Sequence, residues 1–257
     1  MRKFISDFYL VIILIFLYAP IFTMMVFSFN QSKSRTHWGG FTLSWYTQMF
    51  ESRAIMYALY TTLLVAMISA LVATVIGTVT AIAISHMKPV SKNIFMSISN
   101  IPMLNADIVT GIALMLAFIA FGISLGFKTV LISHITFNIP YVILSVMPKL
   151  KQTDRSTYEA ALDLGASPAY AFFEVVFPDI MPGVLSGFLL AFTMSLDDFI
   201  ITHFTKGPGV DTLSTKIYTE VKKGIKPEMY ALSTIIFVTV LVLLLLVNYM
   251  PMAKKKK

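Results

Sequence analysis

The feature that most constrains this chain is a set of long apolar segments that contain few charged residues. An α-helix needs about 20 apolar residues to cross the hydrocarbon core of a bilayer, because each residue advances about 1.5 Å along the axis. Segments of this kind lie at residues 8–29, 59–85, 101–121, 130–147, 182–204 and 231–249. The sequence therefore predicts an all-α membrane protein with six transmembrane helices in a single domain over residues 1–257.

Composition supports a bilayer as the main surrounding of the chain. Hydrophobic residues make up 57% of the sequence and charged residues only 13%, whereas about a quarter of a typical soluble domain is charged. The net charge of +7 does not indicate a nucleic-acid partner, because the basic residues are scattered over the loops and the C-terminal run 254–257. Basic residues beside apolar segments are typical of loops that flank a membrane.

The first apolar segment is expected to remain as a membrane helix. It is about 22 residues long, whereas the apolar part of a secretory signal is about 7–15 residues and precedes a small-residue cleavage site. Arg2 and Lys3 precede this segment, which favours a cytoplasmic N-terminus and, with six spans, a cytoplasmic C-terminus. Over the whole chain, basic residues divide almost evenly between the two sides, so charge alone orients the protein weakly.

The loop at residues 149–181 carries the most specific local pattern. Ser156 followed three residues later by Glu159 predicts a capping box at a helix start. Gly165 is expected to end that helix, and Ser167-Pro168 to begin the next one as N-cap and first-turn proline. From periodicity alone, this pattern is equally consistent with a helical hairpin that lies on the membrane surface.

The residue spacing in this loop resembles the cytoplasmic loop of ABC importer permeases. Glu159-Ala160-Ala161 is followed after three residues by Gly165, and after nine more by Val175-x-Phe177-Pro178, where the family usually has isoleucine and leucine in place of valine and phenylalanine. The resemblance implies a coupling helix that docks onto a separate ATPase subunit, and it places the loop in the cytoplasm. The residues implied in coupling are Glu159, Ala160, Ala161, Gly165 and Pro178.

The chain itself contains no G-x-x-x-x-G-K-[ST] phosphate-binding loop, so ATP with its magnesium is expected in the partner subunit. We therefore expect no cofactor, no metal site and no enzymatic activity in this chain. The absence of cysteine fits this expectation, since it removes thiolate metal ligands and thiol nucleophiles.

Three carboxylates lie within predicted spans: Asp107 in the third, and Asp197 and Asp198 in the fifth. Charged groups at membrane depth are costly and are functional candidates, and these three favour a cationic cargo. Asp107 could instead occupy the first turn of a helix that restarts after Pro102. Adjacent residues point about 100° apart on a helix, so at most one of the other two is expected to face the pathway while the second caps or pairs.

The chain resembles the second permease subunit of spermidine/putrescine importers over essentially its whole length. The resemblance is densest from Tyr158 to Thr234, which includes Ser195-Leu-Asp-Asp-Phe-Ile-Ile-Thr202 and Lys206-Gly-Pro-Gly209. The resemblance implies a bacterial inner-membrane complex with a homologous permease subunit, two ATPase subunits and a periplasmic polyamine-binding protein. For the substrate pathway it favours carboxylates and an aromatic face, which hold alkylammonium ions. The candidates are Trp45, Asp107, Asp197 and Asp198.

Three other functions are alternatives to a polyamine permease. An ABC permease for another small organic solute would share much of this pattern. An ion-coupled secondary transporter could use Asp107 and Asp198 as proton or sodium sites, but the sequence shows no internal repeat and the coupling-loop pattern would be unexplained. A membrane-embedded enzyme is disfavoured, because the four histidines are dispersed without ligand spacing and are expected to be interfacial or structural.

Overall fold

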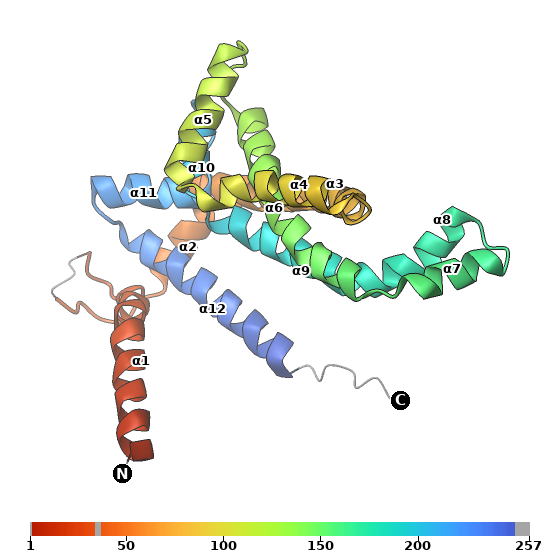
Figure 1. The fold of residues 1–257 in the computed structure, drawn as a ribbon. Helices are drawn as coiled ribbons and strands as arrows, with labels where there is room; N and C mark the ends of the chain where they lie inside the picture. The colour runs from red at the N-terminus through yellow and green to blue at the C-terminus, as the bar shows by residue number, and fades with distance from the viewer. Residues whose placement is uncertain (1, 34–36, 250–257) are drawn as a thin grey trace. The chain divides into compact units, whose positions relative to one another are not determined.

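The computed structural model of the chain describes residues 2–33 and 37–249; side chains of residues 2–7, 155, 240 and 243–249 are outside the description. The described residues form helices, with one isolated β-bridge between Asn30 and Phe41 (Figure 1). The elements are α1 (Arg2–Phe27), α2 (Ser44–Glu51), α3 (Arg53–Ser85), α4 (Pro89–Leu104), α5 (Asp107–Ala120), α6 (Phe127–Gln152), α7 (Arg155–Asp163), α8 (Pro168–Ala171), the π-helical turn η1 (Phe172–Val176), α9 (Phe177–Asp197), α10 (Ile200–Thr205), α11 (Leu213–Lys223) and α12 (Pro227–Tyr249).

Four helical stretches are long and apolar enough to cross a membrane: Phe8–Phe27, Arg53–Ser85, Phe127–Gln152 and Pro168–Asp197. The bent pair α4 and α5 raises the number to five. The predicted segment 231–249 lies within α12, whose side chains from residue 243 onward fall outside the described residues, as do the side chains of Arg2 and Lys3 and the lysine run 254–257. The all-α membrane fold is confirmed, and the count of six spans stays a prediction.

The predicted third span is not one straight helix. The chain is helical to Leu104, extended at Asn105 and Ala106, and helical again from Asp107, with an angle of 102° between the two helices. Pro102 lies inside α4; it has no N–H to donate, and its ring crowds the carbonyl one turn back, which weakens the helix at this point. Asp107 therefore stands in the first turn of α5, as the alternative interpretation expected.

The chain divides into two compact units, Met1–Met56 with Ile217–Lys257, and Tyr57–Lys216. In the first unit, α12 packs against α2 and α1. The asparagine Asn30 organises the connection between α1 and α2: its side-chain oxygen accepts from Gly39 N–H at 2.8 Å, and its backbone oxygen accepts from the Trp45 indole N–H at 2.7 Å. The Trp45 ring is consequently buried, with 6% of its surface exposed.

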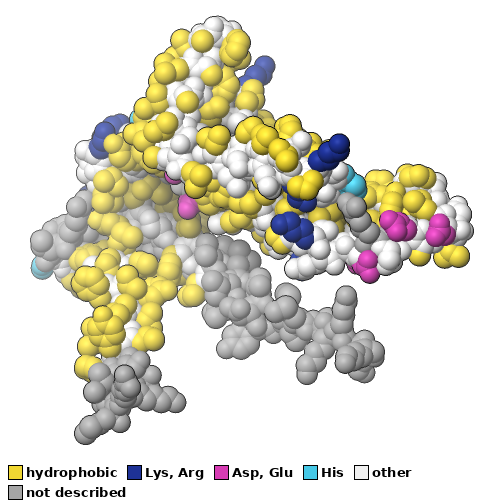
Figure 2. Space-filling model, viewed as in Figure 1, with side chains coloured by type: hydrophobic (Ala, Val, Ile, Leu, Met, Phe, Trp, Pro, Cys, Tyr) yellow, Lys and Arg dark blue, Asp and Glu magenta, His cyan; other side chains and the backbone are white. Residues whose placement is uncertain are grey.

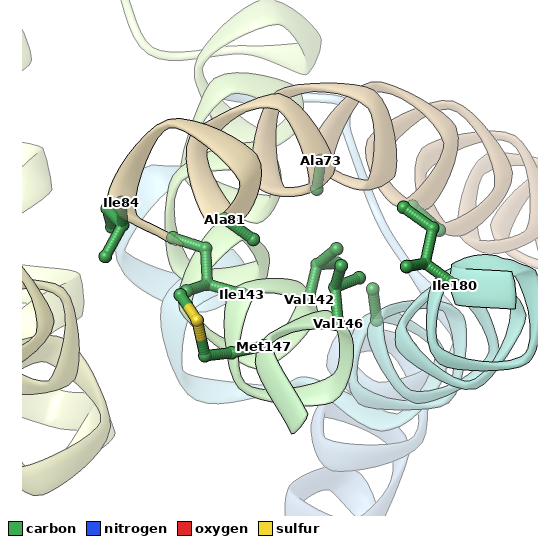
Figure 3. Packing of buried hydrophobic residues seen from close by; sticks show 10 residues of the cluster. Ala73, Ala81, Ile84, Val142, Ile143, Val146, Met147 and Ile180 are labelled. Atoms are coloured by element: carbon green, nitrogen blue, oxygen red, sulfur yellow. The ribbon is translucent and has the colours of Figure 1, made fainter. Parts of the chain in front are cut away.

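The core of the second unit lies between α3, α6 and α9. Figure 3 shows small residues of α3 facing larger side chains of α6. The buried cluster consists of Ala70, Ala73, Ala81, Ile84, Val142, Ile143, Val146, Met147, Ile180 and Ala191. A Cβ on Gly77 of α3 would lie 2.7 Å from the Val142 Cβ. Small residues thus let these helix backbones approach closely, as is common where lipid provides no hydrophobic drive between helices.

Large apolar side chains cover much of the molecular surface, as the yellow areas of Figure 2 show. In α1, none of the apolar stretch Phe8–Phe27 is buried, and Phe16 is 79% exposed. A contiguous apolar surface of this kind requires lipid or another protein as its neighbour. The surface and the helix lengths therefore agree with a protein that crosses a membrane several times.

Candidate functional site

The predicted coupling loop forms a helical hairpin that connects α6 to α9, with α7 and α8 as its short helices (Figure 1). The first helix begins two residues earlier than expected. Asp154 is the N-cap of α7, and its carboxylate accepts from the Ser156 backbone N–H at 3.0 Å. The predicted capping box of Ser156 and Glu159 is therefore wrong, because an aspartate two residues upstream already satisfies the free N–H at the helix start.

The turn between the two short helices follows the prediction. Gly165 has φ +87°, the left-handed region that favours glycine. Its N–H donates to the Leu162 carbonyl at 2.9 Å, and the Ala166 N–H donates to the Ala161 carbonyl at 3.1 Å, which is a Schellman end. Ser167 caps α8 through the Tyr170 N–H, and Pro168 occupies its first turn. The end of α7 and the start of α8 are thus both capped by bonds between residues close in the sequence.

The residues implied in coupling face solvent on this hairpin. Glu159, Ala160, Gly165 and Pro178 are exposed, and Ala161 is half-buried. Around them, Leu164 is 90% exposed and Phe173 61% exposed. Figure 2 shows acidic side chains beside apolar ones over α7 and α8. Because the free carboxylate of Glu159 is not used as a helix cap, it remains available to a partner.

A cavity of about 670 Å³ lies behind the hairpin, between α7 and the ends of α3 and α6. Its wall combines basic side chains, Lys92 and Lys151, with the carboxylates of Asp154 and Glu159. The backbone N–H of Ser156 holds the pKa of the Asp154 carboxyl below its usual range, so this carboxylate is charged at neutral pH. Charged side chains of both signs therefore line this cavity beside apolar ones.

The second group of polar residues lies where α9 ends. The chain leaves the helix at Asp198, and α10 begins at Ile200. The Asp198 carboxylate accepts from the backbone N–H groups of Ile201 at 3.2 Å and Thr202 at 2.8 Å, and from the Thr202 hydroxyl at 2.8 Å. This carboxylate therefore caps α10 from within the predicted fifth span, and 8% of its side chain is exposed. We call residues 197–202 the polar turn.

The polar turn is tied to two other helices through His134 of α6, which is fully buried. The His134 Nδ1 lies 2.9 Å from the Ser195 hydroxyl, and Nε2 lies 2.9 Å from the Thr202 hydroxyl and 3.4 Å from Asp198 Oδ2. Ser195 also accepts from the Asn138 side-chain N–H and contacts the Ser69 hydroxyl of α3, each at 2.9 Å. One network thus joins α3, α6 and α9 to α10.

The sequence predicted that His134 would be interfacial or structural; it is buried and structural, but its partners Ser195 and Thr202 were not predicted. The signal that could have indicated such partners is the spacing of His134. His134 and Asn138 are four residues apart in an apolar segment, so they share one helix face. Two polar residues on one face at membrane depth require polar partners from another helix.

The predicted pathway residues have different surroundings. Asp107 is exposed in the first turn of α5, and Asp197 is exposed at the end of α9. Asp198 is buried in the polar turn, and Trp45 is buried in the first unit. Of the adjacent pair Asp197 and Asp198, one was expected to cap or pair. The structure shows that Asp198 is the residue that caps a helix. Their contact with cargo stays a prediction.

Solved structures with similar folds include chains of ABC transporters. The chain resembles a protein of the transporter that imports the acidic polysaccharide alginate, with a TM-score of 0.76 at 18% identity, over 99% of this chain and 97% of the other. A chain of an amino acid ABC transporter with histidines matches with a TM-score of 0.53 over 77% of this chain and 94% of the other, also at 18% identity. At this identity the likeness establishes the fold, that of an ABC importer permease.

Sequence relatives define the family. Residues 73–251 match the binding-protein-dependent transport system inner membrane component. The Escherichia coli K12 spermidine/putrescine transport system permease protein PotC is 39% identical over 90% of this chain and 87% of its own length, and the putrescine transport system permease protein PotI is 38% identical over 86% and 81%. PotC of Haemophilus influenzae is 35% identical over 95% of both. This chain belongs to that family of inner-membrane permeases, and it is the permease of an ABC importer rather than an enzyme.

Proposed function

We propose that this chain forms part of the translocation pathway of an ATP-driven importer of polyamines, which moves spermidine or putrescine into the cytoplasm by alternating access. The observation that carries the proposal is the similarity, over most of the chain, to relatives whose names specify spermidine and putrescine transport. In this proposal, the helical hairpin between α6 and α9 performs the mechanical part of transport, which is coupling to ATP hydrolysis. The exposed carboxylates perform the chemical part, which is attraction of the cationic cargo.

For the mechanical part, the hairpin transmits the ATPase cycle to α6 and α9. Glu159 and Ala160 are exposed on a helix whose two ends are capped locally. α6 and α9 pack along each other in the core. A push on a rigid, capped hairpin moves its flanking helices as units, since packed interfaces move between discrete arrangements rather than deform continuously. We assign ATP and its magnesium to separate ATPase subunits.

For the chemical part, spermidine and putrescine are flexible cations with protonated amines at both ends. The exposed carboxylates of Asp107 and Asp197 can attract such groups from water, and their weak, solvated interaction suits a pathway that must release its cargo. Asp198 belongs to the same region but is buried. We therefore propose that Asp107 and Asp197 meet the cargo directly, with Asp198 acting through the shape of the turn.

The proposed assembly contains a homologous permease, two ATPase subunits and a periplasmic polyamine-binding protein, with both termini of this chain in the cytoplasm. Support comes from the alginate transporter, a structurally similar protein solved in complex with an oligosaccharide-bound periplasmic protein. The largely exposed apolar stretch of α1 also fits a place beside lipid or a neighbouring subunit. Periplasmic delivery explains why the pathway itself needs little affinity for cargo.

The experiment is uptake of radiolabelled spermidine and putrescine by proteoliposomes that contain the purified complete complex. We expect accumulation that requires ATP on the cytoplasmic side and the binding protein on the other side. Uptake without ATP, driven by a proton or sodium gradient, would contradict the proposal and favour a secondary transporter. ATP-dependent uptake of another organic solute, with no polyamine uptake, would retain the ABC permease and reject the cargo.

A further inference from the structure

A buried histidine outside the predicted pathway carries a further inference. His134 lies in α6, is 0% exposed and cannot touch a solute in the pathway. Both of its ring nitrogens are nevertheless occupied, on one side by Ser195 of α9 and on the other by Thr202 of α10. The two partners stand on either side of the break at Asp198. His134 therefore bridges the two helices that this break separates.

Hydrogen positions in this network can be assigned by counting donors. Each N–H of Ile201 and Thr202, and the Thr202 hydroxyl, donates to Asp198. Since the Thr202 hydroxyl proton is used in this way, its oxygen must accept from His134, so Nε2 carries the proton. Ser195 can then donate to Nδ1 while it accepts from Asn138 and Ser69. A neutral imidazole satisfies all of these partners at once.

We infer that His134 is a positioning residue for transport: through Thr202 and Ser195, it holds Asp198 as the cap of α10 and thereby sets the polar turn that carries Asp197. The inference rests on the proposed function, and it assigns Asp198 to the internal framework of the pathway rather than to the cargo. In a buried site each hydrogen bond is strong and each orphaned partner is costly, so the turn has a defined geometry only while the network is complete.

The chain offers a matched pair of substitutions for a test. Thr202 and Thr205 both lie in α10 and are both fully buried. The Thr202 hydroxyl bonds Asp198 and His134, whereas the Thr205 hydroxyl bonds only the Ile201 carbonyl within its own helix. Valine has nearly the shape of threonine without the hydroxyl. Thr202→Val therefore removes the hydrogen bonds to Asp198 and His134 from the network. Thr205→Val removes a buried hydroxyl of the same kind but leaves the network bonds in place.

The complete complex is assembled with each variant, and its polyamine uptake is measured per amount of complex. We expect Thr202→Val and His134→Leu to lower the maximal rate about tenfold while the half-saturating spermidine concentration changes less than about twofold, and Thr205→Val to resemble the unchanged protein. The double variant that combines Thr202→Val with His134→Leu should transport about as fast as the slower of these two single variants, because both changes break one network. Equal rates for Thr202→Val and Thr205→Val, or fully additive losses, would overturn the inference.

Asp198→Asn separates positioning from cargo binding. Asparagine has one accepting oxygen where aspartate has two, so it can keep either the Ile201 bond or the two Thr202 bonds, and its NH2 group then faces the remaining donor. The maximal rate should therefore fall with the half-saturating concentration unchanged. A half-saturating spermidine concentration that rises about fivefold or more at an unchanged maximal rate would instead place Asp198 in contact with cargo and overturn the inference.

A cargo-independent measurement keeps this inference separate from the proposed function. Hydrogen exchange at the Ile201 and Thr202 amides reports on the cap of α10 without any transported solute. We expect faster exchange at these amides in His134→Leu and Thr202→Val than in Thr205→Val. If polyamine uptake is absent but the exchange pattern holds, the proposed cargo fails and the positioning role stands; if exchange is equal in all variants, the positioning role fails.

Discussion

The coupling hairpin and the polar turn both belong to the second unit, but they hold their polar groups in opposite ways. In the hairpin, the caps join residues that are two to five positions apart, as from Asp154 to Ser156 and from Ala161 to Ala166. The polar turn has a local cap as well, from Asp198 to Ile201 and Thr202, but the network around it is long-range: Ser69 and Ser195 are 126 positions apart, and His134 and Thr202 are 68 apart. The caps of the hairpin are therefore complete within its own sequence, whereas the network around the polar turn forms only when α3, α6 and α9 have packed together.

This contrast predicts different consequences for substitutions. Groups on the hairpin are largely exposed, so water replaces a lost partner at small cost. The groups of the network around the polar turn, His134, Ser195 and Thr202, are buried, so a lost partner leaves an orphaned donor or acceptor in a site of low dielectric. Changes in the turn should therefore act on folding and turnover, and changes in the hairpin on communication with the ATPase.

The largest effect is expected beside the polar turn, at Gly207. A Cβ at this position would lie 2.0 Å from the Leu125 carbonyl oxygen, so Gly207→Ala forces two backbone segments apart. We expect about 3 kcal/mol of destabilisation, seen as a lower thermal unfolding midpoint and less assembled complex. Gly126→Ala is the control, because Gly126 has extended backbone and nothing within 4 Å of its added Cβ. Equal midpoints for the two variants would show that the close approach is not needed.

An intermediate effect is expected at the turn of the hairpin. Gly165→Val places a β-branched residue at φ +87° and costs about 1–2 kcal/mol of local strain. Since the turn is exposed, we expect an assembled complex of normal stability with weaker stimulation of ATP hydrolysis by cargo. Gly165→Asn should retain stimulation, since asparagine tolerates the left-handed region. If the valine variant is stimulated as strongly as the asparagine variant, the turn geometry does not matter for coupling.

A smaller effect is expected at Asp197, the exposed carboxylate of the polar turn. Asp197→Asn removes a solvated charge, so the half-saturating spermidine concentration should rise about threefold at low salt, with a smaller rise at high salt. Asp197→Glu keeps the charge and should behave like the unchanged protein. A salt-independent change, or the same change in both variants, would remove Asp197 from the cargo pathway.

The smallest effect is expected at the cap of α7 and depends on pH. The Ser156 N–H lowers the pKa of Asp154 below the ordinary value of 3.8, so the cap stabilises α7 above that pH and is lost as pH falls through the lower, folded value. Amide exchange in the first turn of α7 should be faster in Asp154→Ala than in the unchanged protein at neutral pH. The difference should shrink once the pH is well below 3.8; a constant difference would mean that charge contributes nothing to the cap.

How much could be predicted from the sequence follows the same contrast. Gly165 and Ser167-Pro168 were assigned correctly because their roles depend on neighbours within a few residues. The predicted capping box was wrong by two residues. Asp154 and Ser156 are both of residue types that cap helices, and Asp154 is the one whose side chain bonds to the helix start. Apolar length located the long helices, but it could not show that Pro102 and Asp107 divide one segment into two helices.

The buried network could not be predicted in the same way. Ser69, His134 and Ser195 lie in three separate helices, and nothing in the local sequence states which faces meet. Asp198 was chosen for its charge in an apolar span, whereas its use as the cap of α10 depends on the break after α9, which apolar periodicity does not reveal. Partner choice across helices is a property of packing.

The division between the two regions can be tested by one measurement, the number of spermidine molecules transported per ATP hydrolysed by the reconstituted complex. This ratio is compared between Glu159→Lys on the hairpin and Thr202→Val in the polar turn, under conditions in which ATP hydrolysis by both variants is fast enough to measure. We predict a lower ratio for Glu159→Lys, because hydrolysis continues without moving the pathway, and an unchanged ratio for Thr202→Val, because transport and stimulated hydrolysis slow together. An unchanged ratio for Glu159→Lys with a lowered ratio for Thr202→Val would contradict this account.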